Sequence, residues 1–134
     1  MSDAWKVIRD AVVGQAVRIT RHESDWQFHF GGNFSIGVGV LCRLRNQTGV
    51  IITNEDDGHK FGLPAPIDAE ERANAIVGSG TCISFEFDAL TSDLKFEFSN
   101  DVTLDVLSNS SGYESWQAWS GSETVAIGAG DGLR

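Results

Sequence analysis

The 134-residue chain carries 19 acidic side chains against 10 Lys and Arg, a net charge of −9, and 41% of its residues are hydrophobic. Residues 67–134 hold twelve acids and three bases, whereas residues 1–66 hold seven of each, so the excess charge lies in the second half. This composition excludes a disordered chain and argues against a nucleic-acid partner, which would need clustered Lys and Arg; it favours one domain spanning residues 1–134.

The N-terminal stretch MSDAWKVIRDAVV carries charges throughout and lacks the apolar run of a signal peptide. No apolar run in the chain is long enough to cross a bilayer, so we expect a cytoplasmic protein with no membrane partner. Cys42 and Cys82 are too few for a disulfide framework. We expect both to be reduced strand residues, and a disulfide between them is the alternative.

In chain order, the first expected element is a helix within residues 3–14, where apolar residues recur at helical spacing before a glycine. A strand follows near residues 17–22, and residues 25–38 predict a hairpin that turns at GGN. Residues 38–53 extend the last strand, turn at NQTG and add a further strand. The stretch NEDDGHKFG, from residue 54 to 62, is expected to be a polar turn or loop.

A second helix is expected within residues 65–78, again followed by a strand, near residues 81–88. Residues 93–106 then predict a second hairpin, which turns at SND. Residues 111–128 predict a further strand pair around SGS. The final AGDGLR is expected to be frayed.

The two predicted hairpins are copies of one pattern. DWQFHFGGNFSIGV (Asp25–Val38) and DLKFEFSNDVTLDV (Asp93–Val106) align without a gap and share their apolar alternation. Each follows a helix and a strand, so the chain divides into two repeats, residues 4–53 and 67–120. We therefore predict an α+β fold with a duplicated helix plus antiparallel β-meander, forming one domain with pseudo-two-fold internal symmetry.

Alternation along the strands predicts which side chains face the core. Ile83, Phe85 and Phe87 should point inward, with Ile19 equivalent to Ile83 in the first repeat. The outward positions of the second repeat are acidic, which suggests either a solvated surface or a face that binds a basic protein. The acidic candidates for partner binding are Glu86, Asp88, Glu97 and Asp105 on the strands, and Asp68, Glu70 and Glu71 on the second helix.

The chain contains no recognisable catalytic motif, and the spacing of its histidines and cysteines matches no metal site. We therefore expect no catalytic residues, no cofactor and no bound metal. The aromatic residues of GYESWQAW allow two interpretations. Tyr113, Trp116 and Trp119 would form a platform for a small ligand at helical spacing, whereas in a strand Trp116 would seal the core and the other two would lie at its rim.

Phe-x-Phe hairpins in both halves and the closing element YESWQ (Tyr113–Gln117) resemble a family of short bacterial proteins of undefined function. In size, acidity and lack of catalytic motifs, the chain is also similar to immunity proteins of polymorphic toxin and contact-dependent growth inhibition systems. That resemblance implies a non-enzymatic inhibitor that occludes the active site of a basic toxin domain. Two alternatives stay open: a self-associating module, such as a homodimer formed through a strand edge, and a small-ligand binder.

Overall fold

The computed structural model describes residues 3–23 and 25–134. This part of the chain forms two antiparallel sheets, two α-helices and a short 3-10 helix, which confirms the predicted α+β class. The first half of the chain contains α1 (Ala4–Val12), β1 (Arg18–His22), β2 (Asp25–His29), β3 (Phe34–Val38), β4 (Leu41–Asn46), β5 (Gly49–Thr53) and η1 (Asn54–Asp56). The second half contains α2 (Ala69–Val77), β6 (Cys82–Phe87), β7 (Leu94–Phe98), β8 (Thr103–Leu107), β9 (Glu114–Ser120), β10 (Glu123–Ala129) and β11 (Gly132–Leu133), so β10 lies just beyond the predicted end of the second repeat.

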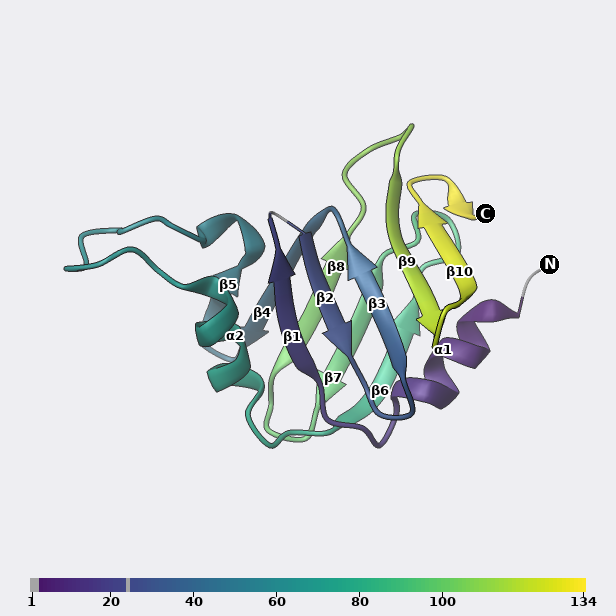
Figure 1. Cartoon of the computed structure of the whole chain (residues 1–134), viewed down its shortest axis with the longest axis horizontal. Helices are drawn as coiled ribbons and strands as arrows, with labels where there is room; N and C mark the ends of the chain where they lie inside the picture. Colours follow the sequence, from purple (N-terminus) through teal and green to yellow (C-terminus); the bar gives the residue numbers. More distant parts are fainter. Residues whose placement is uncertain (1–2, 24) are drawn as a thin grey trace.

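The two repeats exchange their second hairpins. One sheet has the strand order β1-β2-β3-β9-β10-β11 and the other has the order β5-β4-β8-β7-β6. The meander β1–β3 of the first repeat is thus extended by β9 and β10 of the second, and the meander β6–β8 by β4 and β5 of the first. Figure 1 shows the first sheet in front of the second. Each sheet therefore needs strands from both halves of the chain.

The central hairpins of the two repeats, β2–β3 and β7–β8, have corresponding registers. Trp26 pairs with Val38 across β2 and β3, as Leu94 pairs with Val106 across β7 and β8. The exchanged hairpins differ in part, because β4–β5 contains one register shift and β9–β10 contains two. The two halves thus share strand order and the pairing of the central hairpins, while the predicted pseudo-two-fold symmetry stays a prediction.

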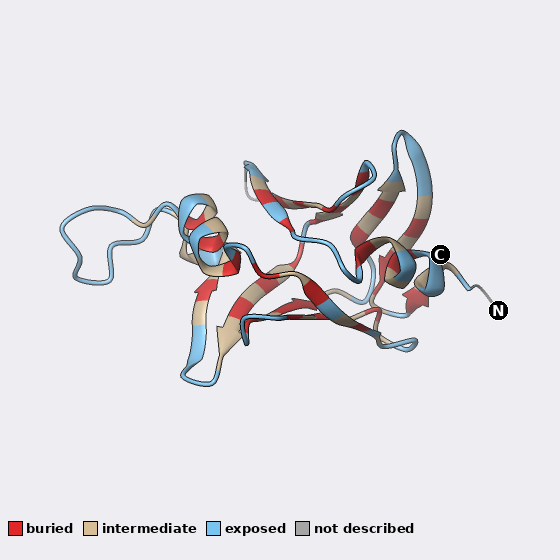
Figure 2. Ribbon diagram, turned by 90° about the horizontal axis from the view of Figure 1, so that it is seen from below, coloured by how far each residue is buried: buried red, intermediate tan, exposed pale blue. Residues whose placement is uncertain are grey.

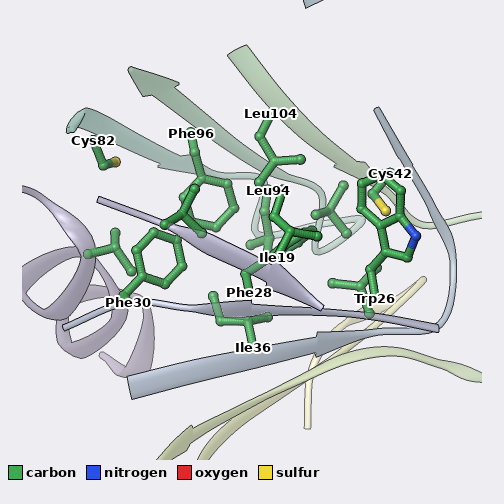
Figure 3. Close-up of a cluster of buried hydrophobic side chains, with 14 of the residues drawn as sticks. Ile19, Trp26, Phe28, Phe30, Ile36, Cys42, Cys82, Leu94, Phe96 and Leu104 are labelled. Carbon is green, nitrogen blue, oxygen red and sulfur yellow. The ribbon is translucent and has the colours of Figure 1, made fainter. Parts of the chain in front are cut away.

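The two sheets pack their apolar faces together, and helices close the sides (Figure 2). Phe28 and Phe96, which correspond in the two repeats, meet with ring centroids 6.5 Å apart, and Phe30 stacks on Phe96 at 5.7 Å (Figure 3). Burial of each such side chain contributes roughly 1.5–3 kcal/mol. Helix α1 packs on β6 and β10, and α2 packs on β1 and β5. The core is thus a single cluster built from both repeats.

Helix α2 begins and ends where the sequence predicts. The Asp68 carboxylate accepts a hydrogen bond of 3.1 Å from the backbone N–H of Glu71, as an N-cap should. The helix ends at Gly78, whose φ of 49° lies in the left-handed region that glycine adopts at low cost. Ala73 and Val77 are buried on the face toward the sheets.

One predicted inward position is wrong. Ile83 is 58% exposed, because a β-bulge between Cys82 and Ser84 adds a residue to the edge strand β6 and turns Ile83 out of the core. The pairing across β1–β2 and β6–β7 shows that Ile19 corresponds to Phe85, so the expected equivalence of Ile19 and Ile83 is also wrong. Phe85 is buried, as expected.

The C-terminal region is better ordered than expected. The last residues form β11, and the Arg134 N–H donates a hydrogen bond of 2.9 Å to the Ile127 carbonyl, so the prediction of a frayed end is wrong. The strand interpretation of the preceding aromatic stretch is confirmed. Trp116 is buried and its indole N–H donates to the Ser92 carbonyl at 2.8 Å, whereas Tyr113 is 80% exposed.

Cys42 and Cys82 are both buried free thiols, so the alternative of a disulfide between them is wrong. They lie at different places in the core (Figure 3). Burial raises the pKa of the Cys82 thiol to about 11 and raises that of Cys42 further. Among the described residues, neither helix has the length and apolar character needed to cross a bilayer.

Candidate protein-binding surfaces

The outer face of the five-stranded sheet was the leading candidate for an acidic surface. A row of side chains crosses it from β6 to β4, in which Glu86 pairs with Lys95, Lys95 with Asp105, and Asp105 with Arg43. The charge alternates in sign along this row. The two arginines of β4 come from the first repeat, because the hairpins are exchanged, and they lie next to the acids of the second.

Asp105 is not available to a partner. Only 7% of its side chain is exposed, and it accepts hydrogen bonds from Arg43 Nε at 3.0 Å and from Arg45 Nε at 2.6 Å. Burial alone would raise the pKa of this carboxyl, but hydrogen bonds from Arg45 and Arg43 and their positive charges outweigh that effect and lower it. The prediction of Asp105 as a partner-binding residue is therefore wrong.

Glu86 and Glu97 share one lysine. Lys95 Nζ lies 3.7 Å from Glu86 and 3.4 Å from Glu97, and all three side chains remain partly exposed. Such exposed pairs contribute little to stability, but they cancel charge. The three acids of this face, Glu86, Glu97 and Asp105, are thus matched by Lys95 and the two β4 arginines. The prediction of an acidic face here is wrong.

Asp88 lies just beyond β6 and orders the turn that follows. Its carboxylate accepts hydrogen bonds from the backbone N–H groups of Leu90 at 2.8 Å and Thr91 at 3.2 Å. This arrangement is an Asx-type turn, in which a short acidic side chain caps nearby backbone donors. Asp88 therefore has a structural role that accounts for an acid at this position.

A different surface is acidic and also exposes apolar side chains. The segment between η1 and α2 projects away from both sheets, at the far left of Figure 1. We call residues 58–67 the projecting segment. Its two ends are held together by hydrogen bonds from Gly58 N–H to the Ile67 carbonyl at 2.9 Å and from Ile67 N–H to the His59 carbonyl at 2.8 Å. The segment is thus a closed loop with an ordered base.

The tip of the projecting segment presents two large apolar side chains to solvent. Phe61 is 67% exposed and Leu63 is 49% exposed. The His59 ring stacks on Phe61, with centroids 5.4 Å apart and planes at 14°. Phe61 has a φ of 45°, a left-handed conformation that is costly for a bulky residue and tends to occur at functional sites. The tip therefore holds an aromatic residue outward at a cost in backbone strain.

The base of the projecting segment is acidic. Residues 54–72 contain six acids and two Lys or Arg. The predicted residues Asp68, Glu70 and Glu71 lie here: Asp68 caps α2, and Glu70 Oε1 accepts a hydrogen bond of 2.7 Å from the Arg21 N–H. Within the described chain, the carboxylates of Glu71 and Glu55 make no hydrogen bond or ion pair. These two acids are free to act on a partner.

An open groove lies at the opposite end of the molecule. It has a volume of about 870 Å³ and lies between α1, the edge strand β6 and β11. Its apolar walls come from Trp5, Phe85, Phe87 and Leu133, and Glu86 and Asp131, which are ion-paired with Lys95 and Arg134, also line it. Sequence reasoning missed this groove, because only the fold brings the first and last elements of the chain together beside β6.

The comparisons with known proteins assign no relative to this arrangement. No family model, no curated protein and no solved structure matches the chain. Among the described residues, no group of three or more His, Cys, Asp or Glu side chains is placed to hold a metal ion. The surfaces themselves, namely the projecting segment and the groove, are therefore the basis for a functional proposal.

Proposed function

We propose that this chain is a non-enzymatic protein-binding inhibitor, an immunity protein that neutralises a basic toxin domain by occluding its active site. The observation that carries the proposal is the projecting segment, which exposes Phe61 and Leu63 above an acidic base. A protruding apolar tip is suited to entering a cleft in a partner. The acids beneath it are suited to the positively charged surface around such a cleft.

The two parts of this surface would contribute differently to binding. Phe61 is the expected hot spot, because aromatic side chains buried at the centre of an interface carry much of the binding energy. Glu55 and Glu71 would mainly accelerate association, since unpaired acids steer a basic partner toward the segment. The hydrogen bonds at the base of the loop reduce the entropy lost on binding, because the loop is already shaped.

The shape of the surface favours binding over catalysis. Catalysis needs several polar groups that converge on a substrate in a concave site. The projecting segment is convex, and its tip offers one stacked imidazole and two apolar side chains. Inserted in the active site of another protein, such a tip would exclude that protein's substrate.

The proposal is tested with three matched baits in an extract of the source cells. These are the wild-type chain, the double variant Phe61→Ser/Leu63→Ser, and Tyr113→Ser, which removes a more exposed aromatic residue elsewhere. We expect a basic protein to bind the wild type and Tyr113→Ser but not the double variant. Expression of that protein alone should be toxic, and co-expression of the wild type should protect.

The charge contribution is measured separately with the isolated partner. Glu55→Lys/Glu71→Lys should lower the association rate constant by about tenfold or more and reduce its dependence on salt, with a smaller effect on dissociation. Full protection by Phe61→Ser/Leu63→Ser at equal protein levels would overturn the proposed interface. A captured partner that is harmless when expressed alone would overturn the inhibitor function.

A further inference from the structure

The outer face of the six-stranded sheet, which is turned toward the viewer in Figure 1, carries a polar pocket of about 300 Å³ over β2, β3 and β9. Its lining combines one partly exposed aromatic ring, Trp119, with the side chains of Gln27, Gln117, Ser115 and Asp25. We propose that this pocket binds a neutral carbohydrate, either a monosaccharide or the end of a short oligosaccharide. The inference goes beyond the inhibitor function, because the pocket shares no residue with the projecting segment.

The strand registers place the two glutamines of the pocket close together. Gln27 pairs with Gly37 across β2 and β3, and Gly37 pairs with Gln117 across β3 and β9. The preceding residues on β2 and β9, Trp26 and Trp116, are buried in the core, so the glutamines point to the outer face of the sheet. Two amide side chains therefore flank a position that has no side chain.

Two glycines hollow this face. Neither Gly37 nor Gly39 has a positive φ, so the backbone does not require glycine at either position. A Cβ at Gly37 would lie 2.9 Å from the Trp119 ring, which therefore packs against the backbone of β3. A Cβ at Gly39 would meet no atom closer than 3.6 Å, so a side chain would fit there. Glycine in a strand often marks a place where a ligand approaches the backbone closely.

The corresponding face of the five-stranded sheet is filled. Asp105 occupies the position that aligns with Gly37, and it is bound by Arg43 and Arg45. Arg43 of β4 pairs with Asp105 as Gln117 of β9 pairs with Gly37. One sheet thus closes its outer face with ion pairs, whereas the other places uncharged amides around a hollow. The shared strand pattern does not require this difference, which makes room for a ligand on one sheet only.

Several polar groups of the pocket have unused hydrogen-bonding capacity. The Ser115 hydroxyl is buried and makes no hydrogen bond. A buried hydroxyl without a partner costs free energy, and a ligand hydroxyl would remove that cost. Within the described chain, the side chains of Asp25 and Gln27 also make no hydrogen bond or ion pair. Gln117 Nε2 donates to the Glu114 carboxylate at 3.0 Å, which leaves the Gln117 amide oxygen available to accept.

This combination of groups selects a neutral polyhydroxylated ligand. Each sugar hydroxyl both donates and accepts, and the pocket offers amide and carboxylate oxygens as acceptors and amide and hydroxyl groups as donors. The C–H groups on the face of a sugar ring pack against the negative face of an aromatic ring, which Trp119 supplies. A cation would leave the donors of Ser115 and Gln27 unpaired, and an anion would be repelled by the Asp25 carboxylate. The volume suits a small ligand.

The test is to titrate the 15N-labelled chain with sugars and to follow its backbone amide signals by NMR. The probes are D-glucose, D-galactose, D-mannose, N-acetyl-D-glucosamine and cellobiose, each at up to about 50 mM, which detects dissociation constants in the millimolar range. Choline and inorganic phosphate serve as the cationic and anionic controls. We expect at least one sugar to shift the amide signals of Gln27, Gly37 and Gln117 in a saturable manner, and neither control to do so.

Two variants assign the binding to this pocket. Trp119→Ala should weaken it by about tenfold or more, whereas Tyr113→Ala, which removes an exposed aromatic residue from the same stretch of chain, should leave it unchanged. Ser115→Ala should weaken it by about two- to tenfold without lowering the stability of the free protein, because the hydroxyl has no partner there. This second variant decides the question if Trp119→Ala does not fold.

The absence of saturable shifts with every sugar would overturn the proposal, as would sugar binding that Ser115→Ala leaves unchanged. Tighter binding of choline or phosphate than of any sugar would overturn the proposed ligand class. Ser115→Ala should keep full protection against the toxin, and Phe61→Ser/Leu63→Ser should keep sugar binding. Either proposal can therefore fail while the other stands.

Discussion

The substitution Asp105→Asn tests how the charged face of the five-stranded sheet is held together. In the wild type, N–H groups of Arg43 and Arg45 reach the Asp105 carboxylate at 3.0, 2.6 and 3.3 Å. An amide has one oxygen to accept these donors, and its NH2 group would face the remaining guanidinium. The variant therefore loses charge-assisted hydrogen bonds at a buried position without a change in side-chain size.

The magnitude follows from these contacts. A hydrogen bond to a charged group contributes roughly 1.5–3 kcal/mol, and loss of a buried partner leaves the donors unsatisfied. The two arginines are about one-third exposed, so water replaces part of the lost interaction. We expect Asp105→Asn to lower the free energy of unfolding by about 2 kcal/mol at pH 7. Glu97→Gln, an exposed control on the same face, should cost about 0.5 kcal/mol or less.

The assay is urea unfolding followed by circular dichroism at several pH values. The pKa of Asp105 lies below its ordinary value of 3.8 in the folded protein, so its contribution is present above that value and is lost as the pH falls through the lower folded value. The difference between wild type and variant should therefore shrink in strong acid. A variant within about 0.5 kcal/mol of wild type at pH 7, or a difference independent of pH, would refute the reasoning.

Three further outcomes follow from the fold. Asn74→Ala should lower the free energy of unfolding by about 2 kcal/mol in urea titrations, because both backbone groups of one edge residue lose their partner; an unchanged midpoint would contradict that role. Ile83→Ser should change the free energy of unfolding by about 0.5 kcal/mol or less, because Ile83 is exposed, whereas Phe85→Ala should lower it by about 3–5 kcal/mol, because Phe85 is buried. A larger effect of Ile83→Ser than of Phe85→Ala would contradict the β6 bulge. The thiols of Cys42 and Cys82 should react with a thiol reagent at pH 8 in urea but not in the native protein, since burial raises their pKa; rapid reaction of the native protein would argue against it.

Local pattern was enough to predict the two α-helices and the hairpins. Phe-x-Phe alternation assigns one face of each hairpin to the core, and Asp68 and Gly78 mark the ends of a helix. The exchange of hairpins could not be predicted in this way. The residue patterns of β4 and β9 do not show which of the two meanders, β1–β3 or β6–β8, each strand joins. The bulge at Ile83 was not predicted for a related reason. No local residue pattern marks the inserted residue, which turns Ile83 outward while Phe85 still faces the core.

The candidate surfaces were harder to predict than the fold. Strand alternation predicts Asp105 as an exposed acid, since nothing in its neighbourhood along the chain shows that Arg43 and Arg45 cover it. Residue composition predicts the projecting segment as a polar loop. Phe61 and Leu63 lie in this Gly- and Pro-containing stretch, and large apolar residues in a turn cannot reach the core, so their presence there indicated an exposed apolar surface. Of the acids chosen from sequence, Glu71 lies exposed at the base of that segment.

The exchanged hairpins also bear on how such a chain could arise. A single repeat would leave its meander without the neighbouring pair of strands, but two separate copies could complete each other by donating hairpins reciprocally, as in a domain-swapped dimer. Fusion of two such copies would give this topology directly, with the segment between β5 and α2 as the join. Fragments covering residues 1–66 and 67–134 should accordingly be incomplete alone and reassemble when mixed.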